Sequence, residues 1–265
     1  MTASSIAATV LPKREHRGAG PGTVVDALTA VPILGGHDSE GQESGALFLW
    51  AHARYNEDYE WELHPHERVE IMTLVIEGHG FDHYDTAKKQ WAHLETGEAQ
   101  LMQAGRGLHH IERYPNGTRG FQIFFDPGEQ IASQNDATYT DYHAKSFSTH
   151  SEGDALVTDF VGGKGPIEVR TEGLTIRRVG VPAGSHATLE VGSDRYTLAF
   201  VINGTAAING TDAVMDDAVR LNGADSMTVE ASEYTDLFVI SVPAQPSYEV
   251  QRFSVADMIR RHQER

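Results

Sequence analysis

The chain has 265 residues, 40% of them hydrophobic and 22% charged, a balance typical of globular proteins with one or two domains. Its formal net charge of −17 argues against direct nucleic-acid binding, because phosphate backbones attract lysine and arginine. It contains no cysteine, which excludes disulfides, thiolate metal sites and thiol catalysis.

Residues 1–45 are predicted to form an N-terminal arm that contributes at most an edge strand, at 24–34. The apolar run at 6–11 is short and precedes the basic residues, whereas a secretory signal has the opposite order and a longer apolar core. No run of about 18 apolar residues occurs, so we expect no membrane span and a cytoplasmic protein.

Residues 46–126 are predicted to form a first β-barrel. Short apolar or alternating runs are separated by turns rich in glycine, asparagine and aspartate, a spacing typical of all-β sandwiches and barrels. The expected strands are 46–53, 61–66, 70–76, 81–85, 91–94, 99–102, 109–112 and 121–125.

Residues 127–165 are predicted to be a polar connection with one strand at its end, and residues 166–245 a second barrel. The Asn-Gly pairs at 203–204 and 209–210 indicate tight hairpin turns in that barrel. Residues 246–265 are predicted to contain a short C-terminal helix. The expected strands after residue 126 are 156–161, 167–170, 174–181, 187–191, 196–202, 205–208, 218–221, 227–230 and 236–242.

The second half repeats the plan of the first. The sequence LVIEG at 74–78 matches FVING at 200–204, and alternating segments follow in both halves. Such internal similarity indicates duplicated β-barrels in an all-β fold. We expect residues 185–187, or residues near them, and the segment 229–232 to stand where the first half carries its histidine motifs, so only the first barrel should bind a metal.

Two short motifs predict that metal site. His64 and His66 are two apart in an expected strand, and so are His110 and Glu112, which places each pair on one face of its strand. Three imidazoles and a carboxylate suit a divalent ion such as Fe, Mn, Ni, Cu or Zn and leave coordination positions open for catalysis. The alternative is that these are structural or surface residues, because the chain has fourteen histidines.

Three nearby residues have two interpretations each. His109 is either a pocket acid or base or, by strand alternation, a histidine that points away from His110. Arg106 either stabilises the glycine-rich turn at 104–107 or meets an anionic substrate. His83 is expected to be solvated or on the outer face of the barrel, although the family resemblance described next implies that His83 with Asp85 matches a recurring position.

These motifs resemble the pirin family of the cupin superfamily. The resemblance covers most of residues 45–245 and rests on His64-Pro65-His66, the Ala-Gly-Arg-Gly sequence at 104–107, His110 with Glu112, and the glycine-rich segment 162–167. It implies a bicupin, two jelly-roll-like antiparallel barrels, with iron in the N-terminal barrel at residues matching His64, His66, His110 and Glu112.

The resemblance also raises a rival for the carboxylate ligand. Cupins in general place a metal-binding glutamate four residues after the second histidine, which is Glu70 in this sequence. The alternative is that Glu70 orients an imidazole from outside the ligand set. The sequence departs from the family at 67–69, at 96–98 and at His109, and these positions bear on the substrate more than on the metal.

The resemblance implies an Fe(II)-dependent dioxygenase of the quercetin 2,3-dioxygenase type. The substrate would be a flavonol-like or enol-bearing small molecule together with O₂, and Glu112 would take a proton from it. One alternative is a non-enzymatic iron-binding regulator that acts through a protein partner. Another is a different metal-dependent reaction, such as that of an isomerase, a decarboxylase or another oxygenase.

Overall fold

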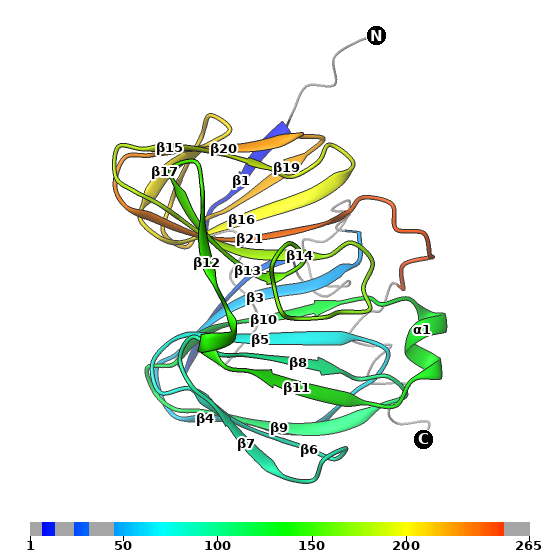
Figure 1. Cartoon of the computed structure of the whole chain (residues 1–265). Helices are drawn as coiled ribbons and strands as arrows, with labels where there is room; N and C mark the ends of the chain where they lie inside the picture. Colours follow the sequence, from blue (N-terminus) through cyan, green and yellow to red (C-terminus); the bar gives the residue numbers. More distant parts are fainter. Residues whose placement is uncertain (1–6, 14–23, 32–44, 252–265) are drawn as a thin grey trace. The chain divides into compact units, whose positions relative to one another are not determined.

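The computed structural model describes residues 7–13, 24–31 and 45–251, which fold into two compact units (Figure 1). We call residues 24–31, 45–146 and 248–251 the first barrel, and residues 7–13 and 147–247 the second barrel. The predicted all-β fold of two antiparallel barrels is confirmed. The predicted C-terminal helix begins at residue 254, which lies outside the described residues.

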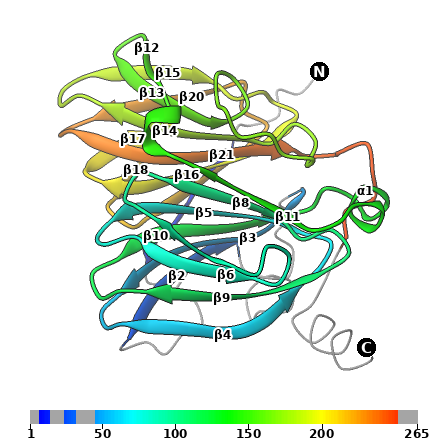
Figure 2. The ribbon, with the colours of Figure 1, turned by 60° about the horizontal axis from the view of Figure 1, so that its bottom comes forward.

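The first barrel consists of two antiparallel sheets, seen as two layers in Figure 2. The strand orders are β11-β8-β5-β10-β3-β2 and β4-β9-β6-β7. The elements are β2 Val25–Val31, β3 Leu47–Tyr55, β4 Tyr59–His66, β5 Glu70–Glu77, β6 Phe81–Asp85, β7 Trp91–Leu94, β8 Ala99–Gln103, β9 Leu108–Tyr114, β10 Arg119–Phe125, α1 Glu129–Gln134, β11 Thr138–Tyr142 and a 3₁₀ turn at Ala144–Ser146.

The second barrel has the same plan. Its strand orders are β1-β19-β16-β21-β14-β13-β12 and β15-β20-β17-β18. Its strands are β1 Ala7–Leu11, β12 Thr149–Glu152, β13 Ala155–Val161, β14 Thr175–Val181, β15 His186–Glu190, β16 Arg195–Asn203, β17 Thr205–Ile208, β18 Thr211–Val214, β19 Ala218–Asn222, β20 Ser226–Ala231 and β21 Thr235–Pro243.

Two segments contain more regular structure than their composition predicted, and a third contains less. Residues 7–11, expected to be part of an arm, pair with β19 along their whole length. The expected connection 127–165 holds α1, β11, β12 and β13. The expected strand at 167–170 is reduced to a single bridge from Ile167 to Val161, because the chain turns tightly through Gly162 to Gly165 and a Cβ at Gly165 would meet the Phe160 carbonyl.

Alternation along the strands places apolar side chains inside both barrels. In β20, Met227, Val229 and Ala231 are buried while the residues between them are more exposed. In β6 the buried face is Phe81, His83 and Asp85, so this strand turns two polar side chains inward. No helix within the described ranges has the length and apolar character needed to cross a membrane.

A turn glycine in the first barrel provides a test of the fold. Gly78, between β5 and β6, has φ +97°, and a Cβ there would lie 2.5 Å from the Gly117 carbonyl oxygen. We expect Gly78→Ala to lower the free energy of unfolding by about 3 kcal/mol, because left-handed strain and a backbone clash add. Tryptophan fluorescence during urea unfolding measures this, since all three tryptophans lie between residues 50 and 91.

The matched control is Gly117→Ala in the same loop region. Gly117 also has a positive φ, +84°, but a Cβ there would meet no described atom within 4 Å. We expect it to cost about 1 kcal/mol, the strain alone. Equal losses in the two variants would contradict the role given to the close approach of the two turns.

Candidate metal centre

Strands β4 and β9 bring the motif histidines together. They pair antiparallel with His64 opposite His110, after a register irregularity between Trp61 and His64. His66 follows two residues after His64 and projects from the same face. Each of the three histidines offers a ring nitrogen within 4.8 Å of the other two. Within the described ranges this is the only group of three or more His, Cys, Asp or Glu side chains that could hold a metal ion.

The three rings converge closely. The ring centroids lie 4.2 Å apart for His64 and His110, 4.8 Å for His66 and His110, and 5.0 Å for His64 and His66. The Nε2 atoms of His64 and His110 are 2.7 Å apart, so one of them carries the proton and the other accepts it. A metal ion bound to both nitrogens would replace this hydrogen bond.

His66 shows that the cluster fits a cation. Its side chain is buried, and neither ring nitrogen has a hydrogen-bond partner among the described residues. Burial lowers the pKa of His66 to about 3, with His64 and His109 adding to the effect, so the ring is neutral at physiological pH. A buried imidazole without a partner is costly unless something accepts its lone pair, and a divalent metal does so.

His83 holds His110 in place from the neighbouring strand. Its Nε2 lies 3.2 Å from His110 Nδ1, and it is fully buried on β6. The expectation that His83 is solvated or on the outer face is therefore wrong. The signal lay in the alternation of β6, which puts His83 on the same face as Phe81. Burial lowers the pKa of His83 to about 4.

Glu112 is buried beside the histidines and held by two donors. Its carboxylate accepts a hydrogen bond from the Tyr114 hydroxyl at 3.0 Å and from Gln122 Nε2 at 3.0 and 3.1 Å. Burial raises its pKa, with His64 and the two donors acting in the opposite direction. Tyr114 is itself stacked on Tyr55, with ring centroids 4.1 Å apart. The carboxylate is not part of the three-histidine group.

The other sequence candidates have different environments. Glu70 is buried on β5, and its Oε1 accepts a hydrogen bond from Gln103 Nε2 at 2.5 Å, outside the three-histidine group. His109 lies on the opposite face of β9, and its backbone N–H donates to Thr86 Oγ1 at 3.0 Å. Arg106 is exposed and forms an ion pair with Asp136.

The two barrels can be aligned through their equivalent turns. Gly78 and Gly204 both have positive φ. Gly78 approaches the backbone just before β10, and Gly204 approaches the backbone at the start of β21. A Cβ at Gly78 would lie 2.7 Å from Thr118 Cα, and one at Gly204 would lie 2.8 Å from Thr235 Cα. Thr118 and Thr235 are therefore equivalent positions.

The second barrel carries apolar residues where the first carries its histidines. Counting back eight residues from the two threonines gives His110 and Met227. His110 pairs with His64 across β4 and β9, and Met227 pairs with Leu189 across β15 and β20. Leu189 and Met227 thus occupy the places of two histidines of the cluster.

The sequence led us to expect these positions at 185–187 or nearby residues and at 229–232, and the alignment places the equivalents of His64 and His110 two residues from those segments, at Leu189 and Met227. Segment 185–187 lies at the start of β15 and segment 229–232 at the end of β20. The two meet where Ala187 pairs with Val229. The second half is shorter than the first between the two equivalent turns, Gly204 to Thr235 against Gly78 to Thr118, so the repeated sequence alone does not align β20 with β9.

Two family models match the chain. The family described as Pirin matches residues 45–125, and the Quercetinase C-terminal cupin domain matches residues 164–242. The quercetin 2,3-dioxygenase of Escherichia coli (strain K12) is 24% identical over 68% of this chain and 75% of its own length. A pirin-like protein of Caulobacter vibrioides is 24% identical over 77% of this chain and 86% of its own.

Solved structures show the same fold. The bacterial pirin YhhW from Escherichia coli, in complex with nickel(II), has a TM-score of 0.74 at 19% identity, covering 89% of this chain and 99% of that one. A quercetin 2,3-dioxygenase from Acinetobacter baumannii has a TM-score of 0.77 at 19% identity, covering 97% of this chain and 94% of that one.

The geometry predicts metal-dependent stability. We expect Ni²⁺ to raise the free energy of unfolding of the wild type by about 2.7 kcal/mol when free metal is 100 times its Kd, because the ion binds only the folded cluster. His66→Ala should lose most of this gain, since it removes one of three donors. Thermal unfolding with and without metal measures both.

His109→Ala is the control for that experiment. It removes an imidazole next to the cluster in sequence but on the other face of β9. We expect it to retain the wild-type gain. An equal loss in both variants would show that the metal binds to histidines elsewhere on the chain.

Proposed function

The chain belongs to the pirin family, and from this premise we propose that it is a metal-dependent dioxygenase of the quercetin 2,3-dioxygenase type. Its substrates would be a flavonol-like or enol-bearing small molecule and O₂. The observation that carries the proposal is the convergence of His64, His66 and His110, with both ring nitrogens of buried His66 lacking a hydrogen-bond partner among the described residues. The names of relatives that are 24% identical support the reaction class.

We propose that His64, His66 and His110 hold the metal and that Glu112 is the fourth ligand or lies next to it. Fe(II) is the proposed ion, and Mn, Ni, Cu and Zn suit the same donors. When bound, the ion supplies Lewis acidity toward a substrate hydroxyl and redox reactivity toward O₂. The His83 contact to Nδ1 of His110 fixes the ring so that Nε2 faces the cluster.

Glu112 is the proposed proton acceptor. Tyr114 donates to Oε1 and Gln122 to both carboxylate oxygens, and a carboxylate has enough lone pairs to accept a further bond from a substrate hydroxyl. Burial among aromatic rings keeps water from competing for that bond. Glu70 is the alternative carboxylate, and its contact with Gln103 supports a role outside the ligand set.

Metal content and oxygen uptake on quercetin test the proposal together. We expect wild-type protein to hold about one metal ion per chain and to consume O₂, with both oxygen atoms entering the product and carbon monoxide released. His110→Ala should lose the metal and at least about 100-fold of the uptake, because a ligand matters more than an outer partner. His109→Ala should match the wild type.

Two outcomes would redirect the proposal. Stoichiometric metal without oxygen uptake would contradict the dioxygenase and favour a regulator with a protein partner, or a reaction such as an isomerisation or decarboxylation. A folded wild type that binds no metal after reconstitution would contradict the metal centre itself.

Glu112→Gln separates the two roles proposed for Glu112. The amide keeps the shape of the side chain but neither ligates well nor accepts the proton. We expect a fall in kcat of about 100-fold or more, the usual contribution of a positioned base. Retained metal would assign Glu112 to proton transfer, and lost metal would make it a ligand. Unchanged activity and metal content would contradict both roles.

A further inference from the structure

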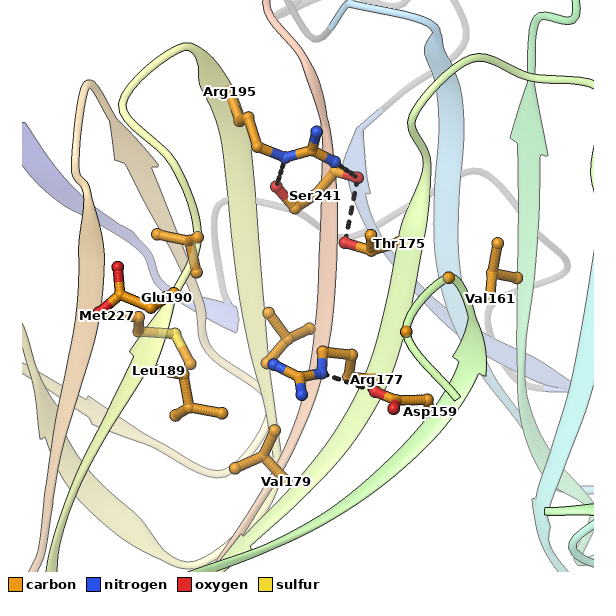
Figure 3. A pocket seen from close by; sticks show the side chains of 14 residues that line it. Asp159, Val161, Thr175, Arg177, Val179, Leu189, Glu190, Arg195, Met227 and Ser241 are labelled. Carbon is orange, nitrogen blue, oxygen red and sulfur yellow. Dashed lines mark hydrogen bonds and ion pairs between the residues drawn. The ribbon is translucent and has the colours of Figure 1, made fainter. Parts of the chain in front are cut away.

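The second barrel contains a cavity of about 260 Å³ that the proposed dioxygenase does not use. Figure 3 shows its wall, with Leu189 and Met227 on one side, Val179 below, and Arg177 and Arg195 reaching in from the other strands. All the lining residues belong to the second barrel.

The apolar side of this cavity stands where the first barrel has its metal cluster. Leu189 and Met227 pair across β15 and β20 as His64 and His110 pair across β4 and β9. Both are fully buried, and neither side chain is a strong ligand for a divalent ion. The cavity therefore suits an organic group in place of a metal.

Arg195 gives the cavity a positive charge without a matching carboxylate. Its guanidinium donates to Ser241 Oγ at 2.8 Å, to the Ser241 carbonyl at 3.0 Å and to the Gly173 carbonyl. No carboxylate of the described residues lies within ion-pair distance, and Nη1 has no hydrogen-bond partner among them. Burial lowers the pKa of this guanidinium, and Asp194 acts against that shift from a distance.

Arg177 differs from Arg195 because its charge is already neutralised. Its Nε donates to Asp159 at 2.8 Å, and its Nη2 forms an ion pair with Glu152. The remaining carboxylate on the wall, Glu190, is exposed. Arg195 is thus the group on this wall that an anionic ligand would satisfy. A carboxylate could accept charge-assisted hydrogen bonds from Nη1, the nitrogen that the contacts with Ser241 and Gly173 leave open.

We propose that the second barrel binds a small organic acid, with its carboxylate on Arg195 and its apolar body against Leu189 and Met227. The volume lies just below the roughly 300–1,000 Å³ of sites for drug-sized ligands, so the acid has about one ring. This site is independent of the metal centre and of the reaction proposed for it.

Benzoate is the probe, and the Met227 methyl group is the reporter. Full-length protein is labelled with [methyl-¹³C]methionine, and Met227→Leu assigns the signal. We expect benzoate to shift the Met227 signal in a saturable way, because an aromatic ring would lie against it. Met72 and Met102, in the first barrel, should not shift. Benzamide, which has the same shape without the charge, should bind at least about 10-fold more weakly.

Two variants test the assigned contacts. Arg195→Met should weaken benzoate binding about 10-fold to 100-fold, the usual effect of losing a charge-assisted hydrogen bond. Arg113→Met, which removes an exposed cation of the first barrel, is the matched control and should bind as the wild type does. Leu189→Phe, which fills the apolar side without touching Arg195, should also weaken binding and decides the question if Arg195→Met unfolds.

The proposal would be overturned by any of three results. Benzoate could fail to shift Met227 at millimolar concentration, or shift it equally in Arg195→Met. Binding could also be lost in His64→Ala and kept in Arg195→Met, which would place the acid at the metal centre. Loss of metal or of oxygen uptake in His64→Ala, with benzoate binding intact, supports two separate sites.

Discussion

The antiparallel pairing of β4 with β9 is the constraint on which the site depends. It sets His64 opposite His110, and the alternation of β4 then brings His66 to the same side. Because side chains alternate across a strand, a register slip of one residue between β4 and β9 would turn one motif pair to the face opposite the other. Strand β6, on the other side of β9, pairs Asp85 with His110 and so carries His83 to its place behind that ring.

Burial also prepares the histidines electrostatically. His66 and His110 are removed from water and lie beside the other rings of the cluster, so a proton on either is opposed by desolvation and by its neighbours. The pKa values of His66 and His110 are both lowered for these reasons. A metal binds imidazole through an unprotonated nitrogen. Folding therefore supplies His66 and His110 in the form that binding requires, and the two unsatisfied ring nitrogens of His66 are part of its cost.

The sequence predicted what alternation and turn chemistry control. The i, i+2 spacing of His64 with His66 needs only strand geometry, and the Asn-Gly pair at 209–210 marked the hairpin of β17 and β18. The pair at 203–204, also predicted to be a hairpin turn, instead links β16 to β17, which lie in different sheets and do not pair. Long-range pairing was not predictable in the same way. Residues 7–11 are a short apolar run within the predicted N-terminal arm. Their pairing was not predictable because the strand that accepts them, β19, is distant in sequence. His83 was misjudged because β6 carries polar residues on both faces, so that Phe81 was the signal of which face is inside and it was not used.

The alignment of the two barrels failed for a related reason. The repeated five-residue sequence at 74–78 and 200–204 fixes one turn, but turns of different length follow it in each half. Only the strand register shows that Leu189 and Met227 occupy the places of the histidines. The same duplication has thus given one barrel ligands for a metal and the other an apolar cavity with an arginine beside it.

Strand β1 has a consequence for how the chain is made. In the sheet order it holds the position beside β19 that β11 holds beside β8 in the first barrel, yet it is synthesised before either barrel. Ala7 pairs with Asn222, so β1 is translated before the strands of the first barrel and its partner β19 only after them. The first barrel can therefore complete its own sheets while β1 still lacks its partner. Pairing of β1 with β19 is a late event of high contact order, because the whole of the first barrel's sheets lies between the two strands in the chain.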